Sequence, residues 1–330
     1  MGKKIIDRRD FLKVSGALGA FILLAPTPII AQKTRRISLA TGGTGGTWYP
    51  FGGGLASILS KYIPGVEVNA EVTAASVDNA MLLGKKKVDI GFVVGDVAYD
   101  AYRGVEKFKD IGKIPLRAVA VKWVHHLHVV TLEGSGINTM KDLRGRRVSI
   151  GAAGSGTEIR SSRALWALGI DAYKDIKTER LSFAESADGL KDRKIDAYFG
   201  DLAIPTASVL DLALTPGVKM KLIPHPEVVP KLREKYGPIY FKATIPKKTY
   251  PGVDYDVENC GVASLMCTLE SEDENLIYQI VKVMIDHQKE LVMVHKQAES
   301  ISPSSIGIGS SIPFHSGALK YFKENKIPTE

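Results

Sequence analysis

Two glycine-rich loops contain the residues of this chain that are best suited to binding a ligand. The first runs from Gly42 to Thr47 and the second from Gly154 to Thr157, each directly before a segment with helical periodicity. Glycine lets the backbone approach a ligand closely, and the free N–H groups at a helix start attract a carboxylate. One such loop alone is more often a plain turn, but the second copy favours binding. The first loop lacks the Gly-Lys-Ser/Thr ending of a phosphate-binding loop, which disfavours a nucleotide.

Further polar residues lie near these loops in the expected arrangement. Ser76 occupies a typical N-cap position, with Asn79 three residues later, and both could instead turn toward a ligand oxygen. Asp96 and Asp201 each follow a glycine at a strand end, where capping of the next helix is the favoured role and binding of a ligand ammonium group is the alternative. The candidate ligand-binding residues are Gly42, Thr44, Gly45, Thr47, Tyr49, Ser76, Asn79, Asp96, Ser155, Gly156, Thr157 and Asp201.

Metal binding and catalysis are less well supported by the sequence. On an extended strand His126 and His128 face one side and His125 the other, and two ligands do not complete a zinc site. A role in a strand linking two halves of the protein is favoured for all three. Ser155 is not framed by a Gly-x-Ser-x-Gly motif,. We expect no metal, no cofactor and no enzymatic activity, with an exported cofactor-dependent enzyme as the alternative.

The two loops belong to a pattern that occurs twice, over residues 37–98 and 148–203. Each copy predicts a β-α-β-α-β unit in which a glycine turn follows the first strand and a Gly-Asp pair ends the last one. Parallel strands joined through helices form an open α/β sheet that binds ligands at the carboxyl ends of its strands. Two such units facing one another predict a two-lobed α/β protein with a ligand cleft between the lobes.

The remaining segments predict how the lobes are joined. Residues 117–131 form a long extended stretch that leads out of the first lobe, and residues 259–268 form a buried strand that leads back. Helical periodicity over residues 273–295 and 316–326 predicts helices that pack on the first lobe. Two crossover strands make a hinge. The expected domains are lobe I over residues 32–125, lobe II over 126–245, and a return to lobe I over 246–330.

Residues 1–31 show the pattern of an export signal: a basic start, an apolar stretch and a small residue before a polar chain,. Within it, Arg8-Arg9-Asp10-Phe11-Leu12-Lys13 is similar to the twin-arginine signal. An uncleaved membrane anchor is the alternative, but the apolar stretch is about a dozen residues and a spanning helix needs roughly 20. We therefore expect a periplasmic or otherwise extracytoplasmic protein.

Charge and cysteine content narrow the class further. The net charge of +8 is not organised into a basic stripe with interleaved aromatic residues, so we expect no nucleic-acid partner,. Cys260 and Cys267 lie in one extended segment, where they would be roughly 23 Å apart, far more than a disulfide permits. We expect two buried thiols in a monomeric protein.

The chain resembles the TAXI family, the solute-binding subunits of TRAP transporters. The residues that carry the resemblance lie at 40–50, 96–102, 151–158, 245–252 and 313–322. The resemblance implies a type II periplasmic-binding-protein fold and delivery of a small organic anion, such as glutamate, 2-oxoglutarate or another dicarboxylate, to TRAP membrane permease subunits. The chain departs from the family pattern at Val94-Gly95 and at Tyr198–Asp201, which puts the ligand in question. A binding protein of another importer, for sulfonates or thiamine precursors, is the alternative.

Overall fold

The computed structural model describes residues 34–329 and contains both of the predicted repeat units. Each unit consists of three strands and two helices in the same order. The first comprises β1 (Arg35–Ala40), α1 (Trp48–Tyr62), β2 (Val66–Glu71), α2 (Ser76–Gly84) and β3 (Ile90–Val94), and the second β5 (Arg147–Ser149), α4 (Gly156–Ala167), β6 (Lys177–Glu179), α5 (Phe183–Lys191) and β7 (Ala197–Leu202). β1 pairs in parallel with β2 and β3, and β5 pairs in parallel with β6 and β7. The predicted β-α-β-α-β repeat is therefore confirmed.

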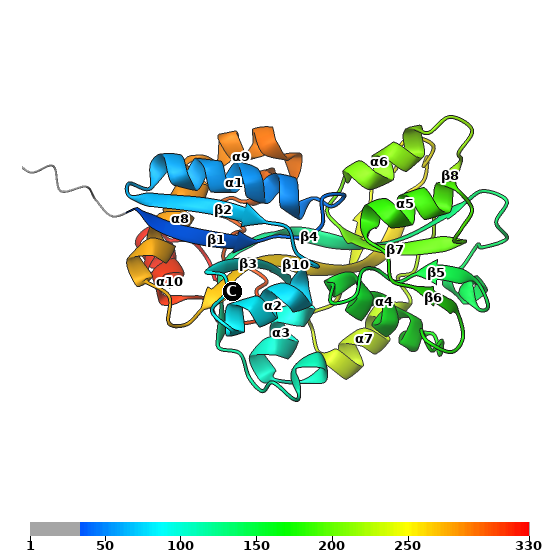
Figure 1. Cartoon of the computed structure of the whole chain (residues 1–330), viewed down its shortest axis with the longest axis horizontal. Helices are drawn as coiled ribbons and strands as arrows, with labels where there is room; N and C mark the ends of the chain where they lie inside the picture. The colour runs from blue at the N-terminus through cyan, green and yellow to red at the C-terminus, as the bar shows by residue number, and fades with distance from the viewer. Residues whose placement is uncertain (1–33, 330) are drawn as a thin grey trace, which may run out of the picture. The chain divides into compact units, whose positions relative to one another are not determined.

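Two long strands connect the repeat units. They are β4 (Leu116–Leu132) and β10 (Val257–Leu269), which are antiparallel and pair with each other along much of their length. β10 also pairs with β3, and β4 also pairs with β7, so the order across the sheet is β2-β1-β3-β10-β4-β7-β5-β6. Figure 1 shows these two strands running from one group of helices to the other. Both crossover segments predicted from the sequence are confirmed.

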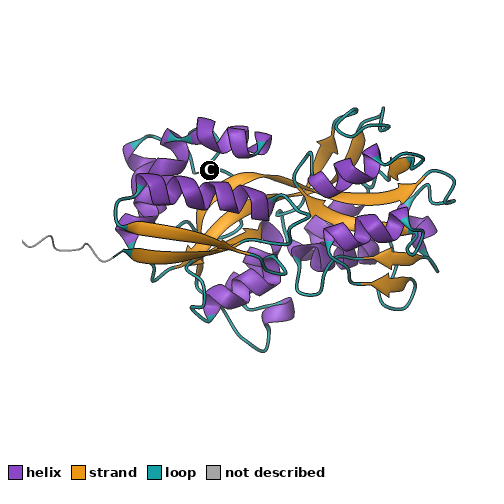
Figure 2. Cartoon of the chain, turned by 45° about the horizontal axis from the view of Figure 1, so that its top comes forward, coloured by secondary structure: helices purple, strands orange, loops and turns teal. Residues whose placement is uncertain are grey.

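The remaining elements extend this framework. Figure 2 shows helices on both sides of the strands in each half of the described chain. The helices are α3 (Gly95–Arg103), α6 (Ala207–Leu214), α7 (Val228–Tyr236), α8 (Glu274–Asp286), α9 (Gln288–Val294) and α10 (Ser316–Glu324), and the further strands are β8 (Met220–Leu222) and β9 (Phe241–Ile245). Short 3-10 helices occupy Glu106–Phe108, Met140–Leu143 and Lys296–Ser300. The lobe boundaries proposed near residues 125 and 245 fall within β4 and at the end of β9.

The core of the first half forms between α1, the sheet and the C-terminal helices. Phe51, Leu55 and Leu59 recur at helical spacing on α1 and are fully buried,. α8 and α9 pack against this helix, as predicted. The single helix expected over residues 273–295 is wrong in one detail, because it breaks at His287, which ends α8 and precedes α9. The side chain of Asp273 caps α8 by accepting a hydrogen bond from the N–H of Leu276 at 2.7 Å,.

Both cysteines lie on β10 and are buried and free, which confirms the interpretation as two thiols. Burial raises the pKa of each thiol to about 12,. The proposed export signal lies outside the described residues. Within residues 34–329, no helix has the length and apolar character needed to cross a membrane.

Candidate functional site

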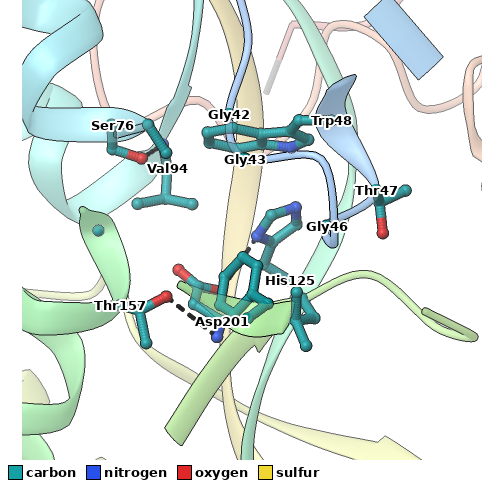
Figure 3. A pocket seen from close by; sticks show the side chains of 14 residues that line it. Gly42, Gly43, Gly46, Thr47, Trp48, Ser76, Val94, His125, Thr157 and Asp201 are labelled. Carbon is teal, nitrogen blue, oxygen red and sulfur yellow. Dashed lines mark hydrogen bonds and ion pairs between the residues drawn. The ribbon is translucent and has the colours of Figure 1, made fainter. Parts of the chain in front are cut away.

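A cavity of about 30 Å³ lies where the two repeat units meet. Its lining comes from both glycine loops, from the starts of several helices, from the ends of β3 and β7 and from the middle of β4. The lining residues are Gly42, Gly43, Gly46, Thr47, Trp48, Ala75, Ser76, Val94, His125, Gly156, Thr157, Phe183, Asp201 and Leu202 (Figure 3). The two loops therefore face a shared cavity, which is the arrangement that the duplicated sequence pattern predicts.

The helix starts give this cavity its electrostatic character. Helices α1, α2, α4 and α5 begin at Trp48, Ser76, Gly156 and Phe183, all of which line the cavity. α3 begins directly after Val94, another lining residue. The first N–H groups of a helix have no partner within it, and the helix dipole places partial positive charge at that end. Several such ends at one cavity favour a bound anion.

Two hydroxyl groups add hydrogen-bond donors on the same side of the cavity. The Ser76 hydroxyl oxygen accepts a hydrogen bond from the N–H of Val94 at 3.2 Å. The Thr157 hydroxyl oxygen accepts one from the N–H of Asp201 at 3.3 Å. Because each oxygen acts as an acceptor in these bonds, each hydroxyl proton can still point to a ligand. Ser76 is not the N-cap that the sequence suggests, since Ala75 holds that position without a side-chain bond.

The carboxylate of Asp201, a lining residue next to Thr157, belongs to a buried ion pair. Asp201 accepts hydrogen bonds from the guanidinium of Arg160 and, at 3.0 Å, from Nδ1 of His125. The Arg160 side chain is fully buried, and that of Asp201 is 3% exposed. Asp201 therefore does not cap the helix that follows it, α6, whose N-cap is Thr206. The role in helix capping that the sequence favours for Asp201 is therefore wrong, because its carboxylate forms an ion pair with Arg160 of α4.

The three histidines on β4 have different surroundings. His125 lines the cavity, whereas His128 accepts a hydrogen bond from the hydroxyl of Tyr250 at 2.9 Å through Nε2. Burial lowers the pKa of His126 to about 3 and that of His128 to about 4, and it holds the pKa of His125 well below its ordinary value,. Among residues 34–329, no three His, Cys, Asp or Glu side chains are arranged to hold a metal ion.

Half of the candidate ligand-binding residues line the cavity. These are Gly42, Thr47, Ser76, Gly156, Thr157 and Asp201. Three of the others have structural partners instead. Asn79 donates to the carbonyl oxygens of Thr41 and Phe92, both at 2.8 Å. Asp96 accepts from the Tyr240 hydroxyl at 2.9 Å, and Ser155 caps α4 by accepting from the N–H of Glu158 at 3.1 Å.

The remaining three candidates lie in the first loop or directly after it but outside the cavity. Thr44 is exposed and Tyr49 is half-buried at the start of α1. Gly45 packs against Ala184 of the second repeat unit.

Aromatic lining residues were not predicted from the sequence. Trp48 and Phe183 line the cavity, and the ring of Trp48 lies 5.0 Å from that of His125, measured between centroids. His125 itself was assigned to the hinge strand alone. The alternation of side chains along a strand, which separates His125 from His126 and His128, is the signal that could have identified it.

The strand order, the two crossover strands and the cavity between the repeat units define a two-lobed periplasmic-binding-protein fold of type II. Several solved structures are similar to the chain. They include a protein from Bordetella bronchiseptica RB50, at 15% identity over 88% of this chain and 89% of that one with a TM-score of 0.52. The periplasmic aliphatic sulphonate binding protein SsuA from Escherichia coli matches at 15% identity over 89% of this chain and 80% of that one, with a TM-score of 0.43. The alkanesulfonate-binding protein SsuA from Xanthomonas axonopodis pv. citri, bound to MOPS, matches at 14% identity over 89% and 94%, with a TM-score of 0.48.

At these identities the likeness concerns the fold. The family follows from the sequence, since residues 39–325 match the model of the NMT1-like family. The chain belongs to the NMT1-like family.

Proposed function

We propose that this protein is the extracytoplasmic solute-binding component of an importer and that it closes its two lobes on a small organic anion. The observation that carries the proposal is the convergence of helix starts from both repeat units on one cavity. Amide N–H groups and hydroxyls bind and orient an anion without a nucleophile or a metal. We therefore propose binding and not catalysis.

We propose that the described arrangement is a closed conformation. A cavity of about 30 Å³ holds roughly one water molecule,. Hydrogen bonds join the repeat units around it: the N–H groups of Val77 and Asp78 both donate to the carbonyl oxygen of Gly154 at 3.2 Å. The hydroxyls of Thr47 and Thr206 are 3.1 Å apart. A ligand the size of glutamate requires the lobes to part, which the two hinge strands permit.

The class of importer is a second part of the proposal. Membership of the NMT1-like family and the similarity to the two sulfonate-binding proteins fit a binding protein of an ABC-type importer better than a TRAP subunit. We therefore propose the alternative raised by the sequence, another importer's binding protein, and keep the TRAP permease as the competing partner on the TAXI resemblance. Ligand uptake by vesicles that contain the permease encoded by the adjacent genes distinguishes the two. ATP-driven uptake supports the ABC class, and uptake driven by an ion gradient supports the TRAP class.

Direct binding measurements test the proposal as a whole. Isothermal titration and thermal unfolding of the purified protein, with carboxylates and sulfonates of increasing size, should give saturable binding and a raised melting temperature. Mass spectrometry of small molecules released from the protein would add a candidate ligand. If no acid binds and the purified protein contains a coloured cofactor or a metal, the enzyme alternative replaces this proposal.

A substitution at Gly156 links the binding to this cavity. A Cβ atom at this position would lie 2.7 Å from Cγ2 of Val94 and 2.9 Å from Oγ of Ser76. Gly156→Ala should therefore weaken binding at least tenfold. Gly53→Ala is the matched control, because a Cβ at that position on α1 meets no atom within 4 Å. Equal affinities for the two variants would place the ligand elsewhere.

A further inference from the structure

The cavity has two chemically different sides, and this difference limits which acids it can bind. One side presents donors: the hydroxyls of Ser76 and Thr157 and the first N–H groups of α4. The other side presents His125 and Asp201 (Figure 3). The donor side suits the acid group that the proposed function requires, so the question is what the second side recognises.

The hydrogen bond between His125 and Asp201 fixes the tautomer of the imidazole. Nδ1 lies 3.0 Å from Oδ1 of Asp201, and a carboxylate can only accept, so Nδ1 carries the proton,. Burial keeps the pKa of His125 well below its ordinary value, so the ring is neutral and Nε2 presents a lone pair,. Among the described residues Nε2 has no hydrogen-bond partner, although the side chain is only 5% exposed.

Asp201 also has an acceptor without a partner. The hydrogen bonds from Arg160 and from His125 both end on Oδ1, and within residues 34–329 none ends on Oδ2. The charge of Arg160 balances that of Asp201, so this wall does not repel an acid as an isolated carboxylate would. Among the described residues, the buried acceptor without a partner at this wall is Nε2 of His125, and a ligand donor would satisfy it,.

We infer that the ligand is an acid that carries a hydrogen-bond donor beside its acid group, such as a 2-hydroxy or 2-amino acid, with Nε2 of His125 as the atom that recognises the donor. This inference rests on the proposed function and adds the ligand class to it. An oxo acid or an unsubstituted acid presents no donor and leaves Nε2 of His125 without a partner. Glutamate therefore fits the cavity chemistry better than 2-oxoglutarate.

Titration with matched acids tests the inference. The three-carbon set is L-lactate, L-alanine, pyruvate and propionate. The five-carbon set is L-2-hydroxyglutarate, L-glutamate, 2-oxoglutarate and glutarate. Taurine and ethanesulfonate form the pair with a sulfonate head. Within the sets that bind, donor-bearing acids should bind at least tenfold more tightly than their partners. The hydroxy and amino members of each set show which donor is preferred.

The outcomes separate the two proposals. If pyruvate, 2-oxoglutarate or an unsubstituted acid binds as tightly as its donor-bearing counterpart, this inference is wrong and the proposed function stands. If no acid binds, the proposed function fails and the inference fails with it.

Variants assign the preference to named atoms. In His125→Asn the amide nitrogen takes the place of Nδ1 and still donates to Asp201, whereas Nε2 is lost. The preference for donor-bearing acids should fall to within about threefold, while the acids still bind. His126→Asn, on the same strand but outside the cavity, should keep the preference. Ser76→Ala should weaken all acids by a similar factor, because it removes a donor from the other side. A preference that survives His125→Asn would overturn the inference.

Discussion

Gly45 packs directly against Ala184 across the junction of the two repeat units. A Cβ atom at Gly45 would lie 3.0 Å from the backbone nitrogen of Ala184 and 3.2 Å from its Cβ. These distances are tighter than most contacts of a Cβ atom, and the neighbour is backbone, which cannot rotate away,. The closed arrangement of the repeat units therefore favours glycine at this position and leaves no room for a larger side chain.

Replacing Gly45 with valine should hold the lobes apart. We expect ligand affinity to fall at least tenfold, since the variant cannot form the closed conformation without displacing α5. Small-angle scattering should show that ligand compacts the native protein and not the variant. Gly53→Val is the matched control, as that position has open space around its Cβ. Normal affinity and compaction in Gly45→Val would show that closure does not depend on this contact.

The fold was largely predictable because its signal is repeated. The strand, glycine loop, helix and Gly-Asp ending occur in the same order in both halves, and strands with this periodicity have few alternative arrangements. Strand β4, which spans 17 residues, was also predictable, because its sequence has the pattern of one long extended stretch.

The candidate site was predictable only in part, because it depends on which side chains meet across the fold. Glycine loops before helices indicate a ligand, and Thr47 and Gly156 do line the cavity. The sequence gives no sign that Arg160, in the middle of α4, faces Asp201 at the end of β7. It also gives no sign that Asn79 donates a hydrogen bond to the carbonyl oxygen of Phe92. Nor does it indicate that Asp96 accepts one from Tyr240, which lies directly before β9. Such pairings follow from tertiary packing.

Lys122 provides a test of stability in the core behind the cavity. Its side chain is 1% exposed and its Nζ has no hydrogen-bond partner among the described residues. Nζ lies 3.2 Å from the ring centroid of Phe92 and 4.7 Å from that of Trp48. Burial lowers the pKa of Lys122 well below its ordinary value,. Lys122→Met should therefore raise the free energy of unfolding by about 1 to 3 kcal/mol.

The effect of Lys122→Met should depend on pH in a defined direction. In the unfolded chain the lysine is protonated below its ordinary pKa of 10.5, whereas in the folded protein burial disfavours the protonated form. Stability is thus lost as pH falls below about 10.5, and the methionine variant should lack this loss. Urea unfolding at pH 7 and pH 10 measures it, with the exposed Lys109→Met as the control. A destabilised variant would show that attraction to the aromatic rings outweighs burial.

His225 should make the protein sensitive to mild acid. Its side chain is fully buried, Nδ1 donates to the carbonyl oxygen of Ile223 at 2.9 Å, and burial lowers its pKa to about 4. In the unfolded chain the imidazole takes up a proton as pH falls below its ordinary value of 6.5, so stability is lost from there down to about pH 4,.

The share of this loss due to His225 can be measured with His225→Phe. At pH 5 the native protein should have lost about 2 kcal/mol through this residue, and the variant should lose correspondingly less between pH 7 and pH 5. Between pH 7 and pH 9 the imidazole is neutral in both states, so the two proteins should respond alike. An unchanged acid response in the variant would show that His225 is protonated in the folded protein.

The ion pair between Arg160 and Asp201 should show strong coupling. Both side chains are nearly or fully buried, so removing one partner leaves the other charge in an apolar setting,. Arg160→Met should lower the free energy of unfolding by about 3 to 5 kcal/mol, and Asp201→Asn should lower it for the same reason. The double variant removes both charges and should be less destabilised than the sum of the single variants. Urea unfolding of the four proteins gives this coupling. Additive effects would mean that the two charges do not interact in solution and that the wall of the cavity is arranged differently.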